Sequence, residues 1–245
     1  MADRLEVKYF VDRTTRTALG RDLRALMGAD THAGTGGTYA VRSIYFDTPD
    51  YLYYHEKLEG LPNRDKPRVR VYGDDPGEAA FVRLEVKSRR MTHGHKASTV
   101  LSREAYEDID AALRRRTLPP AVLLEDPAVR AFFHLVRMYN LEPKVLVQYR
   151  REPLERREGG RIRVNLDDEL VATRRLDLFG PLGGAHRILD YGHAVFEIKA
   201  EDFLPGWLHT LIGKYDLWNE AISKYCLAVR SECLLSEIGR ANDEY

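Results

Sequence analysis

The chain has 245 residues, with 38 Lys plus Arg against 38 Asp plus Glu and therefore a formal net charge of zero. This balance argues against a general binder of nucleic acid or of anionic membranes, and no run of about 18 apolar residues predicts a membrane span. A hydrophobic fraction of 44% is typical of a chain that can bury a core, and we treat residues 1–245 as a single domain.

The predicted strands share β-branched and aromatic residues in alternation with polar ones. They cover 4–11, 39–47, 67–73, 81–90, 96–102, 143–152, 161–166, 169–175, 186–191 and 194–200. The predicted helices begin at capping residues or prolines. They cover 14–27 (capped by Thr14 or Thr15), 103–116 (capped by Ser102), 119–139 with a break at Pro127, and most of 207–238, and residues 49–59 form a short helix or a turn. Strands dominate without regular alternation with helices, which predicts an α+β fold: a mainly antiparallel barrel or deeply curved sheet with helices outside.

One tetrapeptide pattern, an apolar residue, Glu, an apolar residue and Lys, occurs three times. It lies at 5–8, 84–87 and 196–199, each time inside a predicted strand. Successive strand side chains point to opposite faces, so each copy places Glu and Lys on one face and two bulky apolar groups on the other. The same alternation extends the charged faces. They gain Arg4 beside Glu6 and Lys8; Arg68, Arg70 and Tyr72; Arg83 and Arg89 beside Glu85 and Lys87; Tyr149 and Arg151; and Arg161 and Arg163.

Two interpretations of these faces stay open. In a half-exposed antiparallel sheet they are solvated, and Glu–Lys pairs cross the strands. In a closed sheet the apolar faces pack against outer helices and the charged faces line the interior, where repulsion between cations requires a polyanion. The second interpretation predicts a linear chain of phosphates as ligand. Glutamates among the cations would then pair with them or hold a divalent metal that bridges phosphates.

Two observations on charge bear on this choice. Of the 38 cations, 29 are Arg, which reflects either a coding bias or bidentate recognition of phosphate. We expect the acids of 74–78, 107–110 and 167–169 to lie largely in turns and helices. A neutral total would then be compatible with a strongly basic interior.

Nine short segments together carry a resemblance to a known family. They are RLEVKY (4–9), VRSIYFDT (41–48), RVRVY (68–72), LEVK (84–87), Lys96, YRRE (149–152), RIRVNLD (161–167), FEIK (196–199) and ISKYCLAV (222–229). With these segments the sequence resembles the VTC (vacuolar transporter chaperone) catalytic domain, the polyphosphate polymerase branch of the triphosphate tunnel metalloenzymes. The resemblance spans nearly the whole chain.

The resemblance implies a closed, eight-stranded antiparallel tunnel that binds ATP or another triphosphate, or inorganic polyphosphate, together with Mn²⁺ or Mg²⁺. It implies a set of basic phosphate ligands with catalytic roles: Lys8, Arg68, Arg70, Lys87, Arg151, Arg163, Lys199 and Lys224. It implies that Glu197 holds the metal. Further substrate-binding candidates are Lys96, Arg161, Tyr45, Tyr72, Glu6 and Glu85, of which the two tyrosines would line or close the tunnel.

Some roles stay open. Glu6 and Glu85 are candidates for a second metal ligand, a base for water or an ion-pair partner, and we favour the ion pair for Glu85. Asp47 follows a strand and is as compatible with a turn as with a functional role. Arg4 stands where other tunnel enzymes carry the first Glu of an ExExK signature, which removes one candidate metal ligand and fits the VTC branch better.

The function that the resemblance implies is a polyphosphate polymerase, which transfers the γ-phosphoryl group of ATP to a growing polyphosphate chain. The alternatives are a hydrolase of tripolyphosphate or polyphosphate in the same tunnel, for which Glu6 would orient water, and a non-catalytic polyphosphate-binding module. The sequence leaves oligomeric state, acceptor and chain length undetermined.

The expected location is cytoplasmic. The first residues lack the basic and apolar stretches of a secretory signal. Cys226 and Cys233 lie seven positions apart, too far for a disulfide if both are on one helix. Free thiols fit a reducing compartment.

Overall fold

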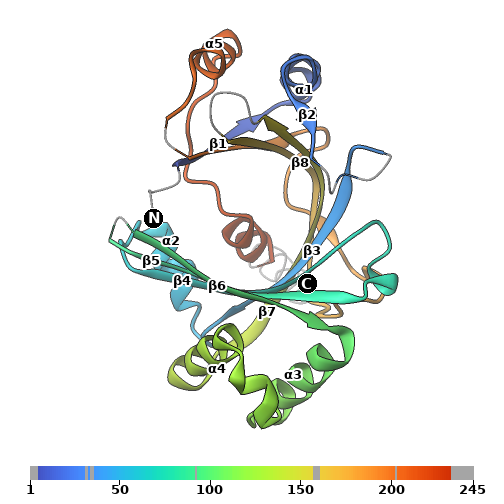
Figure 1. Ribbon diagram of the computed structural model, residues 1–245, viewed down its shortest axis with the longest axis vertical. Helices are drawn as coiled ribbons and strands as arrows, with labels where there is room; N and C mark the ends of the chain where they lie inside the picture. Colours follow the sequence, from blue (N-terminus) through green and yellow to red (C-terminus); the bar gives the residue numbers. More distant parts are fainter. Residues whose placement is uncertain are drawn as a thin grey trace, which may run out of the picture. The chain divides into compact units, whose positions relative to one another are not determined.

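The computed structural model describes residues 5–30, 33, 36–91, 93–156, 161–201 and 203–232 (Figure 1). The chain divides into two compact units, each assembled from separate segments. Unit 1 consists of Met1–Val41, Gln148–Val171 and Arg187–Ser223, and unit 2 of Arg42–Val147, Ala172–His186 and Lys224–Tyr245. The chain passes between the units inside four of its strands, and we describe each unit separately. The single domain over 1–245 stays a prediction.

Unit 1 is an antiparallel arrangement of strands with two helices on its apolar face. The strands pair in the order β1 (Leu5–Val11), β10 (Ala194–Ala200), β8 (Ile162–Thr173) and the later part of β7 (Glu142–Arg156). The short strands β2 (Gly28–Ala29) and β9 (His186–Arg187) pair with β7 and β8. Helices α1 (Arg13–Leu26) and α5 (Gly206–Lys214) bury Leu19, Leu23, Leu208 and Leu211 against Tyr9, Phe196 and Ile198. Burial of leucines of this kind stabilises the fold by about 2 kcal/mol each.

Unit 2 carries helices on both faces of its strands. Following the first part of β7, the strands pair in the order β3 (Tyr39–Asp47), β4 (Arg64–Tyr72), β5 (Phe81–Arg90) and β6 (His93–Ser102). The helical elements are α2 (Leu52–Leu58), η1 (Pro76–Glu78), α3 (Arg103–Arg115), η2 (Ala121–Glu125), α4 (Pro127–Tyr139) and residues 224–232. Helices α3 and α4 cover one face of β5 and β6, and residues 224–232 lie on the other face (Figure 1).

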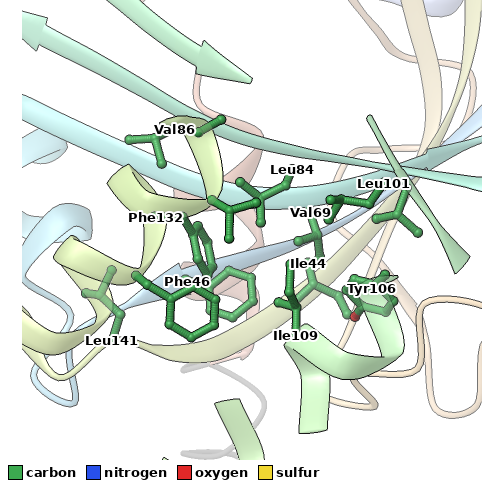
Figure 2. Packing of buried hydrophobic residues seen from close by; sticks show 14 of the residues in the cluster. Ile44, Phe46, Val69, Leu84, Val86, Leu101, Tyr106, Ile109, Phe132 and Leu141 are labelled. Atoms are coloured by element: carbon green, nitrogen blue, oxygen red, sulfur yellow. The ribbon is translucent and has the colours of Figure 1, made fainter. Parts of the chain in front are cut away.

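Strand alternation determines which face of unit 2 is apolar. Leu84 and Val86 point toward the helices, where they meet Phe132 of α4 and Ile109 of α3 (Figure 2). The ring of Phe46 packs edge-on against Phe132, with 5.0 Å between the ring centroids. In the copies at 84–87 and 196–199 both apolar residues enter a core on the helical side, and Val7 of the copy at 5–8 packs partly buried against the core of unit 1. Glu and Lys of these strands therefore face the other way, as predicted.

The predicted capping residue is confirmed for helix α3 and is wrong for helix α1. The Ser102 hydroxyl accepts the backbone N–H of Ala105 at 3.2 Å and caps α3 as expected. The prediction of Thr14 or Thr15 as the first cap was wrong. The side chain of Asp12 caps α1, because its carboxylate accepts the N–H groups of both threonines at 2.8 and 2.9 Å.

Three sequence boundaries also need correction. The predicted strands 161–166 and 169–175 form one strand, β8, so Asp167 and Asp168 lie in a strand and not in a turn. The predicted strand 186–191 shrinks to two residues, because 188–191 leave the ladder. Residues 215–223 separate α5 from the last helix, which begins at 224.

The α+β class with an antiparallel sheet is confirmed, but the closed eight-stranded barrel is wrong. The pairing of the described strands runs from β1 at one end to β6 at the other, with no pairing between these two. Closure requires every strand edge to be paired. In the described part of the chain, two edges therefore remain.

Some expectations fall outside the described residues: the side chain of Arg4, Cys233 and the last helical residues up to 238. Within the described part of the chain, no helix combines the length and the apolar character needed to cross a bilayer.

Candidate phosphate-binding faces

The charged face of unit 2 is arranged in rows across β4, β5 and β6. The strand register places Lys66 opposite Lys87 and Lys87 opposite Lys96, so three ammonium-bearing side chains share one row. The next rows align Arg68, Glu85 and Ser98, and then Arg70, Arg83 and Val100. The face is therefore strongly cationic, and it contains four of the basic residues predicted from the sequence.

Glu85 binds two of these cations. Its carboxylate lies 2.7 Å from Arg68 Nε and 2.5 Å from Lys96 Nζ, and the residue is only 2% exposed. Burial alone would raise the pKa of Glu85, but Arg68, Arg70 and Lys96 hold it well below its ordinary value. Glu85 is thus an ionised ion-pair partner, as favoured from the sequence, and Lys96 lies on the same charged face.

Tyr45 of β3 lies beside the same cations. The Arg68 guanidinium carbon is 6.0 Å from the centre of its ring, and the residue is 3% exposed. Burial opposes ionisation of the phenol, yet Arg68, Arg70, Lys66 and Lys224 together lower the pKa of Tyr45 to about 7. A group of positive charges is therefore concentrated at this phenol.

Arg70 is oriented by hydroxyl groups. Its Nε donates to Ser43 Oγ at 2.8 Å, and its Nη1 donates to the hydroxyl of Tyr72 at 3.4 Å. Tyr72 is 40% exposed, which places it at the rim of this face and distinguishes it from buried Tyr45. These two contacts orient the Arg70 guanidinium on the charged face of unit 2.

Lys224 begins the last helix and comes close to this face. Tyr225, the next residue, packs its ring on Tyr45 with 5.4 Å between centroids. The charge of Lys224 contributes to the lowered pKa of Tyr45. The structure therefore brings this distant lysine to the arginines of β4.

The charged face of unit 1 is balanced by carboxylates. Glu197 of β10 lies 2.8 Å from Lys199 Nζ and 3.7 Å from Arg151 Nη2. Arg151 of β7 also makes a bidentate pair with Asp167 of β8, with distances of 2.6 and 2.7 Å. Burial lowers the pKa of Lys199, although Glu197 opposes the shift. Burial also disfavours the charged form of Arg151, but Asp167 and Glu197 raise its pKa above the ordinary value.

The outer part of this face contains the remaining predicted residues. Lys8 pairs with Glu6 of the same strand at 2.8 Å, and the register places Lys8 opposite Glu197. Arg161 and Arg163 share the carboxylate of Glu155, at 2.6 and 3.6 Å. Arg161 precedes β8 and is not part of the strand. Glu6 is therefore an ion-pair partner, and both arginines lie next to each other as the sequence predicted.

Burial excludes the interpretation that the centres of the charged faces are open to solvent. Arg70 is 5% exposed, Glu197 is 5% exposed and Asp167 is fully buried. Charged groups of this kind are rarely buried unless they are paired. The ion pairs described above provide partners for Glu197 and Asp167, and the hydroxyl groups of Ser43 and Tyr72 bind Arg70. The centres of both charged faces are therefore organised.

The described residues around Glu197 provide oxygen donors for a hard divalent cation, but they do not complete its coordination shell by themselves. The described residues contain no group of three His, Cys, Asp or Glu side chains arranged for a metal. Glu197, Asp167 and Asn165 nevertheless present oxygen donors on one face of β8 and β10, where Asn165 is opposite Glu197 in register. Mg²⁺ is commonly bound by one or two carboxylates, with phosphate oxygens and water completing the shell. A metal that shares its ligands with a phosphate chain is compatible with this donor set.

Four residues were missing from the predicted site. Asp167 was assigned to a turn, and Ser43, Tyr149 and Asn165 had no assigned role. The hydroxyl of Tyr149 accepts Arg151 Nη2 at 3.4 Å, and its ring lies 5.3 Å from that guanidinium. The alternation that selected Arg151, Arg163 and Tyr45 also selects these four positions. Ser43, Tyr149 and Asn165 each lie two residues from a chosen residue, and Asp167 lies four residues from Arg163.

A comparison with family models decides the assignment suggested by the motifs. The model of the VTC domain matches residues 3–233. The chain belongs to the VTC domain family. The match includes segments of both units and every residue that we assign to the two charged faces. It confirms the resemblance inferred from the short motifs.

Solved structures share the fold of this VTC domain. A candidate adenylate cyclase from Bacillus halodurans has a TM-score of 0.51 and 14% identity, with 91% of this chain and 94% of that chain covered. A candidate adenylyl cyclase from Hippeastrum, described as having a dominant triphosphatase activity, has a TM-score of 0.52 and 14% identity, with 94% and 96% covered. Identity at this level establishes the fold alone.

Proposed function

We propose that this VTC domain is a polyphosphate polymerase, which transfers the γ-phosphoryl group of ATP to a growing polyphosphate chain with Mn²⁺ or Mg²⁺. The observation that carries the proposal is the alignment of arginines and lysines on one face of the strands in each unit. Arginine forks and lysine ammonium groups at alternate strand positions suit a linear polyanion, whose phosphates repeat along a line. Membership of the VTC domain family supports an activity on triphosphate or polyphosphate.

In this proposal the basic residues position the phosphates. On unit 2, Arg68, Arg70, Lys87, Lys96 and Lys224 bind phosphate oxygens, and Tyr45 and Tyr72 border them. On unit 1, Lys8, Arg151, Arg163 and Lys199 do the same, with Arg161 beside them. Catalysis of phosphoryl transfer depends mostly on such positioning and on stabilisation of charge.

The reaction needs an acceptor oxygen and a leaving group. A terminal oxygen of the acceptor chain forms a bond to the γ-phosphorus, the bond to the β–γ bridging oxygen breaks, and ADP leaves with that electron pair. Cations that bind the transferred group offset the charge that accumulates on its oxygens. Glu197, with Asp167 and Asn165 beside it, would hold the metal, which neutralises phosphate charge when bound.

A hydrolase is the second candidate, and two observations favour it. Glu6 is a partly exposed carboxylate on the face of unit 1, 2.8 Å from Lys8, and a carboxylate there can orient water. The Hippeastrum protein with the same fold has a dominant triphosphatase activity. Water would then take the place of the acceptor phosphate.

The deciding experiment incubates the purified protein with ATP and Mn²⁺ or Mg²⁺ and measures long-chain polyphosphate and free phosphate separately. We expect polyphosphate to accumulate with an equal release of ADP. Free phosphate without polymer would favour the hydrolase, and neither product with retained polyphosphate binding would favour a binding module. Arg114→Ala, on the outer helix α3, is the matched control and should leave both products unchanged, because Arg114 pairs with Asp110 of its own helix.

A further inference from the structure

The carboxylate of Asp47, at the end of β3, is buried and accepts four hydrogen bonds. Its Oδ1 accepts the backbone N–H groups of Thr48 and Tyr53, at 2.7 and 2.9 Å. Its Oδ2 accepts the N–H of Tyr54 at 3.0 Å and the hydroxyl of Tyr225 at 2.5 Å. A single side chain thus connects the end of a strand, the first turn of α2 and the last helix of the chain.

The hydrogen bonds from the backbone N–H groups of Thr48, Tyr53 and Tyr54 have an ordinary structural explanation. The first N–H groups of a helix lack intrahelical partners, and a carboxylate at the helix N-terminus satisfies them. The bond to Tyr225 is different, since it joins Asp47 to a residue 178 positions away. It is charge-assisted and shielded from water, because Tyr225 is 3% exposed.

Two contacts fix the Tyr225 side chain, one at its hydroxyl and one at the face of its ring. Its hydroxyl is bound by Asp47, and its face packs on Tyr45, with an angle of 32° between the rings. Because Tyr225 follows Lys224 directly, fixing this ring fixes the start of the helix and the backbone of Lys224. Lys224 in turn is close enough to Tyr45 for its charge to act on the phenol.

We propose that Asp47 is a positioning residue for the phosphate-binding face of unit 2: through the Tyr225 hydroxyl it fixes the first turn of the last helix and so holds Lys224 beside Tyr45 and the arginines of β4. The proposal rests on the proposed function, since it assigns Lys224 to the phosphate site. Asp47 itself touches no phosphate.

The sharpest variant is Tyr225→Phe, because it removes the bond to Asp47 and keeps the ring and the cap of α2. The probe is inorganic tripolyphosphate, and the measurement is its affinity by titration calorimetry. We expect Lys224→Ala to weaken binding by about tenfold and Tyr225→Phe by a few-fold, in keeping with loss of one charge-assisted contact. In the Lys224→Ala background, Tyr225→Phe should have no further effect, because it acts through the lysine.

The matched control is Tyr53→Phe. Tyr53 adjoins the same carboxylate through its backbone, and among the described residues its buried hydroxyl has no hydrogen-bond partner. This variant should bind tripolyphosphate as the wild type does. Equal weakening by both tyrosine variants, or additive effects of Tyr225→Phe and Lys224→Ala, would overturn the proposal.

A second measurement separates this inference from the proposed function. Lys224 contributes to the lowered pKa of Tyr45, so its displacement should raise that pKa toward the ordinary value. The tyrosinate absorbance of the ligand-free protein reports the titration, and Tyr45→Phe identifies the signal. We expect a raised pKa in Tyr225→Phe and in Lys224→Ala, and no change in Tyr53→Phe. An unchanged pKa in a folded Tyr225→Phe would overturn the inference, whereas the expected shifts without any tripolyphosphate binding would overturn only the proposed function.

Discussion

The two charged faces differ in how their charges are balanced. On unit 1, Glu6 and Glu197 pair with lysines of their own strands, and Asp167 pairs with Arg151. On unit 2, across the described strands β4, β5 and β6, the charged face has one carboxylate, Glu85, among many cations. One face is a network of ion pairs and the other has an excess of positive charge.

This difference suggests a division of roles. A balanced face is stable without a ligand and offers carboxylates that a divalent metal can bind. A face with excess cations lowers the pKa of its own phenol at Tyr45, and a polyanion would offset its charge more completely than one glutamate does. We therefore expect substitutions on the face of unit 1 to change the metal dependence of the activity. We expect substitutions on the face of unit 2 to change the affinity for phosphate.

The largest effect should come from Glu197→Gln. The substitution keeps the shape of the side chain and removes the charge that faces Lys199 and Arg151. We expect metal-dependent turnover of ATP to fall by about a thousandfold, the size of the loss when a group that stabilises transition-state charge is removed. The affinity for tripolyphosphate without metal should not fall, because a negative charge has been taken away.

The control for this variant is Asp22→Asn. Asp22 belongs to the same unit and pairs with Lys214, but it lies on the helical side, between α1 and α5. Its turnover should equal that of the wild type. Unchanged turnover in a folded Glu197→Gln would rule out the metal role of Glu197 and the division of roles between the faces.

The fold could be predicted from the sequence wherever one pattern governed a segment. The observed bounds of β3 and β5 equal the predicted ranges 39–47 and 81–90, because the alternation there places apolar groups such as Ile44 and Leu84 in a core. Closure of the sheet could not be predicted in this way. Alternation fixes the face of a side chain, but the pairing of the first strand with the last depends on contacts between distant segments.

Prediction of the site was limited in the same way, because contacts between distant segments are not visible in a local pattern. Alternation identified the charged faces and most of their cations, since this property is local. Asp167 was missed because three consecutive acids resemble a turn, whereas the bidentate contact with Arg151 of another strand keeps Asp167 in β8. The role of Asp47 was equally hidden, because its partner Tyr225 is 178 positions away.

A moderate effect is expected from Arg70→Ala on unit 2. Arg70 is oriented by Ser43 and Tyr72 toward the cationic face, so its loss removes a charge-assisted contact with phosphate. We expect roughly tenfold weaker binding of tripolyphosphate and a shallower dependence of affinity on salt. Titration calorimetry at several salt concentrations measures both quantities.

Arg90→Ala is a matched control for Arg70→Ala, because it removes the same type of side chain from the adjacent strand. Arg90 lies on the opposite face of β5 and pairs with Asp65 at 2.8 Å. We expect some loss of stability and no change in phosphate affinity or in its salt dependence. Equal losses of affinity in both variants would mean that the charge of the whole unit, and not its face, attracts phosphate.

The smallest effect, and the most specific, concerns the pH dependence introduced by Tyr45. Its folded-state pKa of about 7 lies below the ordinary value of 10.0, so the ionised phenol stabilises the ligand-free fold. That contribution is fully present above about pH 10 and is lost as the pH falls through about 7. The difference in free energy of unfolding between the wild type and Tyr45→Phe should therefore grow with pH in this window.

Phosphate binding should show the opposite trend, because a bound polyanion occupies the same cations that stabilise the phenolate of Tyr45: Arg68, Arg70, Lys66 and Lys224. Binding then raises the pKa of Tyr45 and takes up a proton, so the wild type should lose a few-fold more affinity than Tyr45→Phe as the pH rises above about 7. Calorimetry in buffers of different ionisation enthalpy measures the proton uptake directly. Identical proton uptake in both proteins would show that phosphate does not reach the cations around Tyr45, and it would remove unit 2 from the proposed site while leaving the ion-pair network of unit 1 unaffected.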